Sequence, residues 1–129
     1  MKGTDHAKLS RRERQIMDII FELGQATAAE VLDKLPDPPS YSAVRAMLRI
    51  LEEKSHLKHH QVGPRYVYQP TVSRQAARDT AIERVVRTFF DGSTEQAMAA
   101  LLDLSSAQMS QNELDRLQEM IEQARKEGR

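Results

Sequence analysis

The clearest pattern of hydrophobic and polar positions lies between residues 42 and 51. Apolar side chains recur there at i, i+3, i+4 and i+7, namely at Val44, Met47, Leu48 and Leu51. This spacing puts them on one face of a helix, so we expect that face to enter the core. The opposite face carries small residues and long hydrogen-bond donors, namely Ser42, Arg45, Ala46 and Arg49. Such a face is what a helix needs to approach the base edges in a DNA groove.

An extended pattern follows this helix. Residues 58–62 and 65–68 each have the composition of a β-strand, and Gly63 and Pro64 between them are turn residues. The sequence therefore predicts a β-hairpin with Arg65 at its tip. A helix with an exposed arginine face and a hairpin directly after it form the outline of a winged helix.

Helix starts are marked by pairs of residues that can form reciprocal capping hydrogen bonds. In each pair a serine or threonine precedes a glutamate or glutamine by three positions. The pairs are Ser10 with Glu13, Thr27 with Glu30, Ser93 with Gln96, and Ser110 with Glu113. Gly24 and Pro36 are expected to end the first two helices. Pro38 and Pro39 form a stiff connector to the arginine-bearing helix.

The second part of the chain shows three helical patterns with narrow apolar stripes. A segment of about 55 residues rarely builds a sufficient core alone, so we expect these stripes to pack against a second copy of the chain. The residues assigned to that contact are Phe89, Phe90, Leu101, Leu114, Leu117 and Ile121. We predict a mainly α fold with a small β-hairpin. In it, residues 1–72 form a winged helix-turn-helix that binds DNA, and residues 73–129 form a three-helix dimerisation region.

Composition limits the location and the partners of the chain. With 129 residues, 40% of them hydrophobic and 29% charged, the chain fits a globular protein. It has no cysteine, which excludes disulfides and thiolate metal sites. No apolar run is long enough for a membrane span, so we expect a cytoplasmic protein that does not contact a membrane.

The net charge of zero hides a difference between the two parts of the chain. Lys and Arg outnumber Asp and Glu by 12 to 9 through Arg74, and they are outnumbered by 7 to 10 from Gln75 onward. The first part is therefore the candidate for binding nucleic acid, and the second part is the candidate for protein contacts.

No arrangement of catalytic residues is recognisable. The sequence has no glycine-rich phosphate loop, no nucleophile elbow, and no carboxylate pair beside a histidine in its apolar stretches. We therefore expect neither an enzyme nor a bound cofactor. His56, His59 and His60 form the one cluster that resembles a metal site. His59 and His60 point to opposite faces of a strand, which favours phosphate contact or solvation over metal binding and leaves the role of the cluster open.

Two interpretations of the arginines are open from the helix alone. Arg45 and Arg49 lie four residues apart on one face, and such a pair can simply be solvated. The hairpin favours DNA contact over simple solvation. With Arg65 beside the arginine face, the helix and the hairpin together can make major-groove and phosphate contacts. Tyr66 and Tyr68 share a strand face, and we expect them to pack the hairpin onto the helices with their hydroxyl groups at the rim.

Four segments occur in an order that is specific as a set: LSRRERQIMDIIFELGQATAAEVLDKL, YSAVRAMLRILEEKSHL, GPRYVYQP and FFDGS. Through them, the chain from Leu9 to about Ala124 resembles the penicillinase-repressor family of winged-helix regulators, an antibiotic-response family that contains the beta-lactamase and methicillin-resistance repressors. The resemblance implies a homodimeric repressor whose third helix enters the major groove of a palindromic operator. It also implies that the C-terminal helices interlock to form the dimer.

The resemblance assigns roles to single positions. The base-facing positions of the family match Ser42, Ala43, Arg45 and Ala46, and its wing arginine matches Arg65. We assign contacts with the DNA backbone or at the wing to Thr27, Ser40, Tyr41, Arg49 and Arg65. The family commonly has threonine where this chain has Ala43 and Ala46, so methyl groups replace hydroxyl contacts and a different operator is expected. Ser55 stands where the family usually has glycine, and serine tolerates a left-handed backbone less well.

Release of the repressor is a further implication of the resemblance. Some family members are inactivated by proteolysis downstream of a membrane sensor of beta-lactams. The matching bond in this chain lies between Ala100 and Leu101. The residues around that bond differ from those of the cleaved members. A sensor-linked protease is therefore a candidate partner. The copper-responsive branch binds metal through C-terminal cysteines, which this chain lacks, so no copper switch is expected.

Taken as a whole, the sequence predicts a transcriptional repressor that binds double-stranded operator DNA as a homodimer. Two recognition helices related by a two-fold axis meet half-sites that are separated by a whole number of helical turns. The alternative is a winged helix that serves as a protein-interaction module and does not read DNA. This alternative stays open because one fold can serve different functions.

Overall fold

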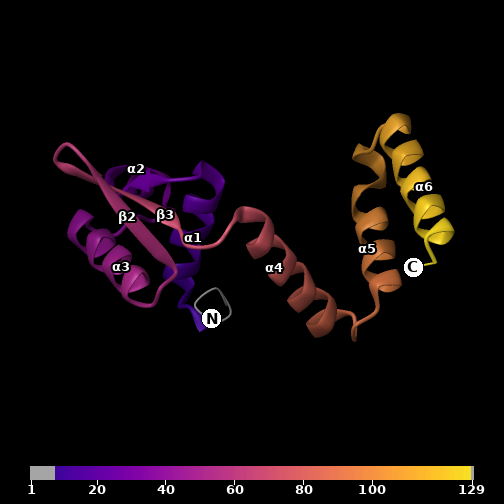
Figure 1. The fold of residues 1–129 in the computed structure, drawn as a ribbon, viewed down its shortest axis with the longest axis horizontal. Helices are drawn as coiled ribbons and strands as arrows, with labels where there is room; N and C mark the ends of the chain where they lie inside the picture. Colours follow the sequence, from indigo (N-terminus) through magenta and orange to yellow (C-terminus); the bar gives the residue numbers. More distant parts are fainter. Residues whose placement is uncertain (1–7, 129) are drawn as a thin grey trace. The chain divides into compact units, whose positions relative to one another are not determined.

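The computed structural model describes residues 8–128 (Figure 1). The chain divides into two compact units, residues 1–84 and residues 85–129, and each is considered by itself. The structure is mainly helical with one small antiparallel sheet, which confirms the predicted winged-helix fold class. No helix in the described part of the chain is long and apolar enough to cross a lipid bilayer.

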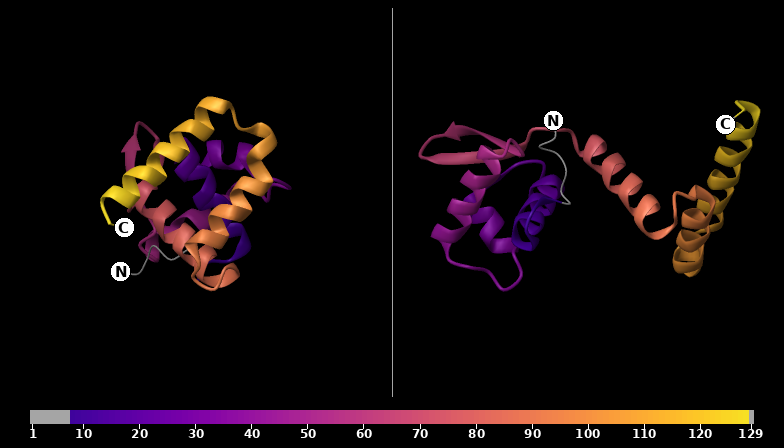
Figure 2. Two further views of the ribbon diagram at one scale, coloured as in Figure 1. Left: turned by 90° about the vertical axis from the view of Figure 1, so that its right-hand side faces the viewer. Right: turned by 90° about the horizontal axis from the view of Figure 1, so that it is seen from below.

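The first unit combines three helices with three strands. Its elements are α1 (Arg11–Leu23), β1 (Ala26–Thr27), α2 (Ala28–Lys34), α3 (Tyr41–Glu53), β2 (Leu57–Val62) and β3 (Arg65–Pro70). The antiparallel pair β2–β3 is the predicted hairpin, and Val62 pairs with Arg65 across the turn at its tip. Figure 2 shows this hairpin running along the helices of the unit to its outer edge. Gly63 in the turn has a φ of 61°, which favours glycine because a side chain is strained there.

Strand β1 is an addition to the predicted elements. It is two residues long and pairs Ala26 with Tyr68 and Thr27 with Val67, so the sheet has the order β1-β3-β2. No local pattern predicts so short a strand, because its partner lies in a distant part of the chain. The pairing ties the connection between α1 and α2 to the middle of strand β3.

The helices begin where the capping pairs predict. Three pairs form the reciprocal capping box, in which the hydroxyl group accepts from a backbone N–H and the glutamate accepts from the N–H of the cap residue; they are Ser10 with Glu13, Thr27 with Glu30, and Ser110 with Glu113. Ser93 accepts a hydrogen bond from the Gln96 N–H. Ser40 caps α3 in the same way through the Ala43 N–H, so every predicted start is confirmed.

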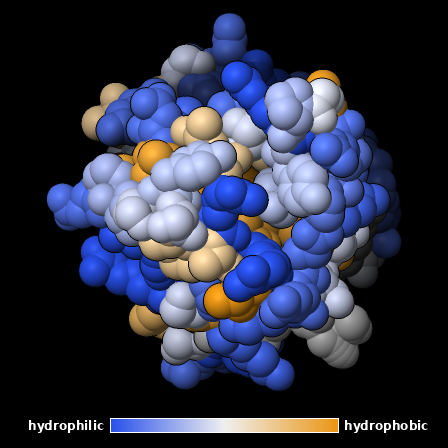
Figure 3. Space-filling model, turned by 90° about the vertical axis from the view of Figure 1, so that its left-hand side faces the viewer, coloured by the Kyte–Doolittle hydropathy of each residue, from blue (hydrophilic) through white to orange (hydrophobic). Residues whose placement is uncertain are grey.

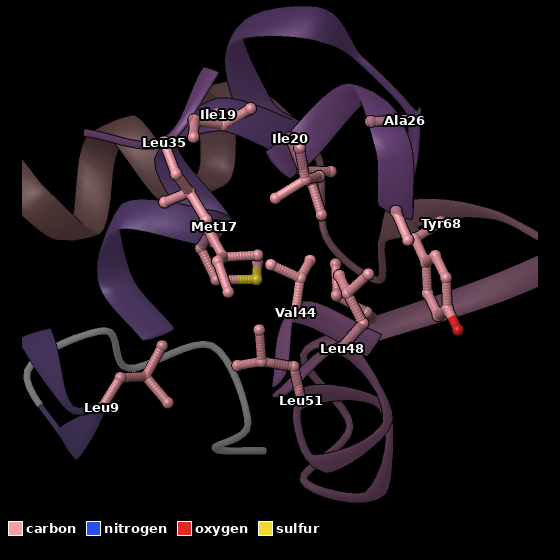
Figure 4. Packing of buried hydrophobic residues seen from close by; sticks show 14 residues of the cluster. Leu9, Met17, Ile19, Ile20, Ala26, Leu35, Val44, Leu48, Leu51 and Tyr68 are labelled. Atoms are coloured by element: carbon pink, nitrogen blue, oxygen red, sulfur yellow. The ribbon is translucent and has the colours of Figure 1, made fainter. Parts of the chain in front are cut away.

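One hydrophobic cluster holds the first unit together (Figure 4). Its fully buried large side chains come from all three helices and from β2, namely Ile16, Met17, Ile20, Val31, Val44, Leu48, Leu51 and Leu57. Tyr68 of β3 closes the cluster beside Leu48, and its hydroxyl group points away from the apolar side chains. Because α3 contributes three of these residues, its backbone is fixed against the core.

A buried carboxylate connects the first and third helices. Glu13 is 7% exposed, and its Oε2 lies 3.2 Å from Nζ of Lys54, at the end of α3. Burial alone raises the pKa of Glu13, but the backbone N–H of Ser10 and the ammonium group of Lys54 outweigh that effect and lower the pKa below its usual value. The pair adds a polar tie to the apolar contact between α1 and α3.

The described residues of the second unit form no buried core of their own. The helices of the second half of the chain are α4 (Arg74–Phe89), which crosses from the first unit into the second, α5 (Thr94–Ser105), the short η2 (Ser106–Gln108) and α6 (Gln111–Lys126). Among the described residues of these helices, none is buried. The predicted functional division after residue 72 stays a prediction.

Candidate nucleic-acid interface

The two faces of α3 differ in exposure as the sequence predicts. The core face is fully buried at Val44, Leu48 and Leu51, and Met47 packs at the edge of the cluster. The outer face is exposed at Ser42, Arg45 and Arg49, and it is half-buried at Ala43 and Ala46. The outer face therefore carries exposed polar side chains and two alanines on a helix whose opposite face packs in the core.

A groove separates α3 from the hairpin. It is lined by Thr27 and Ala28 at the start of α2, by Tyr41 and Arg45 of α3, and by hairpin residues that include Gln61, Arg65 and Tyr66. Four predicted DNA contacts, Thr27, Tyr41, Arg45 and Arg65, thus meet in one concave surface. Tyr66, whose hydroxyl group was expected at the rim, lines the same groove, and Gln61 is an addition to the predicted residues.

A second groove follows the outer face of α3 toward its end. Its lining includes four predicted contacts, Ser42, Arg45, Ala46 and Arg49. It also includes His59, Tyr66 and Tyr68, for which the sequence left a phosphate contact open, and Glu52, which the sequence did not assign to the interface. Arg45 lines both grooves and so lies between them. Of the predicted contacts within residues 8–128, Ser40 and Ala43 line neither groove.

Two predicted contact residues already serve as helix caps. The hydroxyl group of Thr27 accepts from the Glu30 N–H at 3.2 Å and lies 3.3 Å from the Glu30 carboxylate. Ser40 Oγ accepts from the Ala43 N–H at 3.1 Å and lies 3.2 Å from Ser42 Oγ. These hydrogen bonds give both residues a structural role as helix caps. Their contact with DNA stays a prediction.

One aromatic ring lies close to Arg45. Its guanidinium carbon lies 5.9 Å from the centre of the Tyr41 ring, within the range of a cation–π contact. Tyr68 is next to it in the second groove, and burial raises the pKa of the Tyr68 hydroxyl, with the Glu52 carboxylate adding to the rise and Arg45 opposing it. The guanidinium group of Arg45 therefore lies beside an aromatic ring while the residue stays exposed.

The three histidines of the candidate metal cluster lie in three different environments. His59 Nδ1 is 2.7 Å from both carboxylate oxygens of Glu52, and its ring stacks on Tyr66 with 4.2 Å between the centroids. His60 is exposed, and His56 is 6% exposed. Within residues 8–128 no three His, Asp or Glu side chains are arranged to hold a metal ion.

The surface around the hairpin tip and α3 is predominantly hydrophilic. Figure 3 views this side directly and shows polar residues over most of it, with apolar side chains gathered in small patches near the centre. A face of this kind suits a hydrated, charged ligand better than an apolar one.

The residues assigned to dimerisation differ in exposure. Phe89 is 72% exposed, Leu101 is 62% exposed and Ile121 is 49% exposed. Phe90, Leu114 and Leu117 are half-buried. The bond between Ala100 and Leu101 lies inside α5. The second unit therefore presents large apolar side chains that its own helices do not cover.

A comparison with known protein families covers most of the chain. The family model described as penicillinase repressor matches residues 9–123, which include both grooves and most of the second unit. The chain belongs to the penicillinase repressor family. No curated protein matches the sequence. As a member of the penicillinase repressor family, the chain falls among transcriptional regulators and not in a class of enzymes.

Proposed function

We propose that the chain is a homodimer that represses transcription by binding a palindromic operator. In this proposal α3 enters the major groove, where Ser42, Arg45 and Ala46 face the bases, and the hairpin holds the DNA backbone through Arg65. One observation supports it above the others: Arg45 and Arg65 line one groove although they come from different elements. A guanidinium group can read a guanine edge or bind phosphate with paired hydrogen bonds.

Rigidity of the scaffold supports the same proposal. The core face of α3 is fully buried, so the exposed row keeps its orientation before DNA arrives. Binding then costs little conformational entropy, because few groups have to be ordered. Membership in a family of transcriptional repressors supports the repressor role.

The uncovered apolar residues of the second unit support a dimer. Monomeric proteins rarely expose contiguous apolar patches of large area, and Phe89 and Leu101 are largely exposed. A second copy covers such residues and at the same time supplies a second recognition helix. Two-fold symmetry of the protein then requires an inverted repeat in the DNA.

Selection of DNA by the protein tests the proposed function. The full chain is mixed at physiological salt with a pool of random-sequence duplexes, and the retained DNA is sequenced through repeated rounds. We expect an inverted repeat whose half-sites are about 10 base pairs apart or a multiple of that. Enrichment of no sequence, together with co-purification of a protein partner, contradicts DNA readout and favours the interaction module.

Proteolytic release is part of the proposal. The bond between Ala100 and Leu101 lies inside α5, so a protease reaches it only after local opening of the helix. In cells that carry this protein, exposure to a beta-lactam is expected to produce a fragment that ends at Ala100, detectable by mass spectrometry. A chain that stays intact while the repressed gene is switched on contradicts this route.

A further inference from the structure

The end of α3 carries a carboxylate inside the groove that is proposed to face DNA. Glu52 follows Arg49 by three positions, and both residues line the groove together with Arg45. Residues three apart on a helix are neighbours, so a free carboxylate at Glu52 can pair with the guanidinium group of Arg49. A free carboxylate in this place also repels DNA phosphates.

In the structure this carboxylate is held by the hairpin. Both of its oxygens lie 2.7 Å from His59 Nδ1, and the side chains of His59 and Glu52 are 30% and 32% exposed. The imidazole ring is itself held by Tyr66, on which it stacks at an angle of 14°, and by Tyr68, whose ring centre lies 5.6 Å away. Within residues 8–128, no ion pair engages Arg45 or Arg49.

We propose that His59 is a positioning residue that keeps Glu52 away from Arg45 and Arg49 and so leaves both arginines available for DNA. The inference rests on the proposed function. His59 lies on β2 and Glu52 on α3, so the bond also ties the hairpin to the recognition helix. The arrangement assigns a role to one of the three histidines whose function the sequence left open.

Loss of the imidazole is expected to act through the released carboxylate. In the His59→Ala variant, Glu52 is free to pair with Arg49 or to face the phosphates, and either result weakens DNA binding. A loss of about tenfold in affinity corresponds to roughly 1.4 kcal/mol. The loss should disappear once the carboxylate is neutralised, which a purely structural role of His59 does not predict.

A double-mutant cycle tests the inference on the full chain. The variants are His59→Ala, Glu52→Gln and both together, and the probe is the duplex recovered by selection with the wild-type chain. Affinity is measured at one salt concentration, and folding is checked by thermal unfolding. We expect His59→Ala to bind about tenfold more weakly. The affinity of the double variant is expected to lie within about twofold of the affinity of Glu52→Gln. A difference of that size is within the error with which independent changes add.

Matched variants separate this role from others. His59→Asn keeps a donor near the position of Nδ1 and should retain affinity, whereas His59→Phe keeps only the stacked ring and should behave as His59→Ala. Glu53→Gln removes a neighbouring carboxylate that does not line the groove. This control should leave the affinity unchanged.

Two results overturn the inference, and they differ from failure of the proposed function. If His59→Ala binds as the wild-type chain does, His59 does not position Glu52. If the loss from His59→Ala is equally large in the Glu52→Gln background, His59 acts by another route, such as direct contact with DNA. If the wild-type chain itself binds no duplex, the proposed function fails and the inference fails with it.

Discussion

At the scale of single residues, Ser55 has a backbone conformation that is unfavourable for a residue with a side chain. Ser55 has a φ of 71°, in the left-handed region, and it follows the end of α3, where it donates its N–H to the Glu52 carbonyl at 3.0 Å. The family usually has glycine at this position, and serine tolerates the left-handed conformation less well. Thr71 completes the turn by donating its hydroxyl to the Ser55 carbonyl at 2.7 Å.

Replacement of Ser55 by glycine should stabilise the protein. A left-handed conformation costs a residue with a side chain roughly 1 kcal/mol more than glycine, and the bonds of Ser55 to Glu52 and Thr71 use only its backbone. We expect the free energy of unfolding to rise by about 1 kcal/mol, measured by urea denaturation. Gly24 provides the reverse control, since its φ of 88° should make Gly24→Ala destabilising. A less stable Ser55→Gly variant contradicts the account.

The pKa of Glu13 should make stability depend on pH. Its value in the folded protein is lowered from 4.5, so the stabilisation is fully present above about pH 4.5 and is lost as the pH falls through the lower folded-state value. Glu13→Gln should therefore cost about 1–2 kcal/mol at neutral pH and flatten the loss of stability in acid. Denaturation midpoints measured between pH 3 and pH 7 check this. Asp18→Asn, at an exposed position of the same helix, should leave the stability at neutral pH unchanged.

At the scale of elements, α3 and the hairpin are expected to contribute differently to DNA binding. In the proposed complex α3 faces the bases, and the hairpin carries Arg65 at a tip defined by the turn at Gly63 and Pro64. Contacts with bases provide specificity, whereas contacts with phosphates provide affinity that depends on salt. Substitutions in the two elements should therefore give separable effects.

Arg45→Ala should remove discrimination between operator and other DNA. Loss of a bidentate contact with a base costs about 1–3 kcal/mol of specificity. In gel shifts we expect the variant to bind the selected duplex no better than a scrambled one, while sedimentation still shows a dimer. Arg78→Ala, at an exposed position of α4, serves as the control. Unchanged preference for the selected duplex removes Arg45 from the readout.

Arg65→Ala should weaken binding to every duplex by a similar factor. Each phosphate contact contributes about 0.9 to the slope of log affinity against log salt concentration, so loss of one contact should lower the slope by about one. Titrations at several salt concentrations measure this slope for the selected and the scrambled duplex. An unaltered slope contradicts a phosphate contact at the hairpin tip.

At the scale of the whole molecule, the uncovered residues of the second unit should determine the oligomeric state. Leu101 is 62% exposed in the single chain, and burial of a leucine side chain contributes about 1.5–3 kcal/mol. Leu101→Lys should therefore shift the protein from dimer to monomer in analytical ultracentrifugation, and it should lower operator affinity through loss of the second half-site.

A second lysine substitution controls for added charge. Gln96 lies on the same helix and is exposed, so Gln96→Lys should leave the dimer intact. A wild-type chain that stays monomeric at high concentration contradicts the dimer, and with it the expected palindrome.

Sequence alone was sufficient for features that depend on near neighbours. The capping pairs Ser10 with Glu13 and Thr27 with Glu30 act over three positions, and the apolar face of α3 follows from helix periodicity. Such interactions are encoded within one turn of a helix. For the same reason the hairpin turn and its arginine could be predicted correctly.

Tertiary structure decided which distant residues meet. Strand β1 exists because Ala26 pairs with Tyr68, and Lys54 reaches Glu13 across 41 positions of sequence. His59 meets Glu52 only because β2 folds back along α3, which also places Arg65 in the groove beside Arg45. These contacts depend on packing of elements around a shared core, which no local pattern of residues contains.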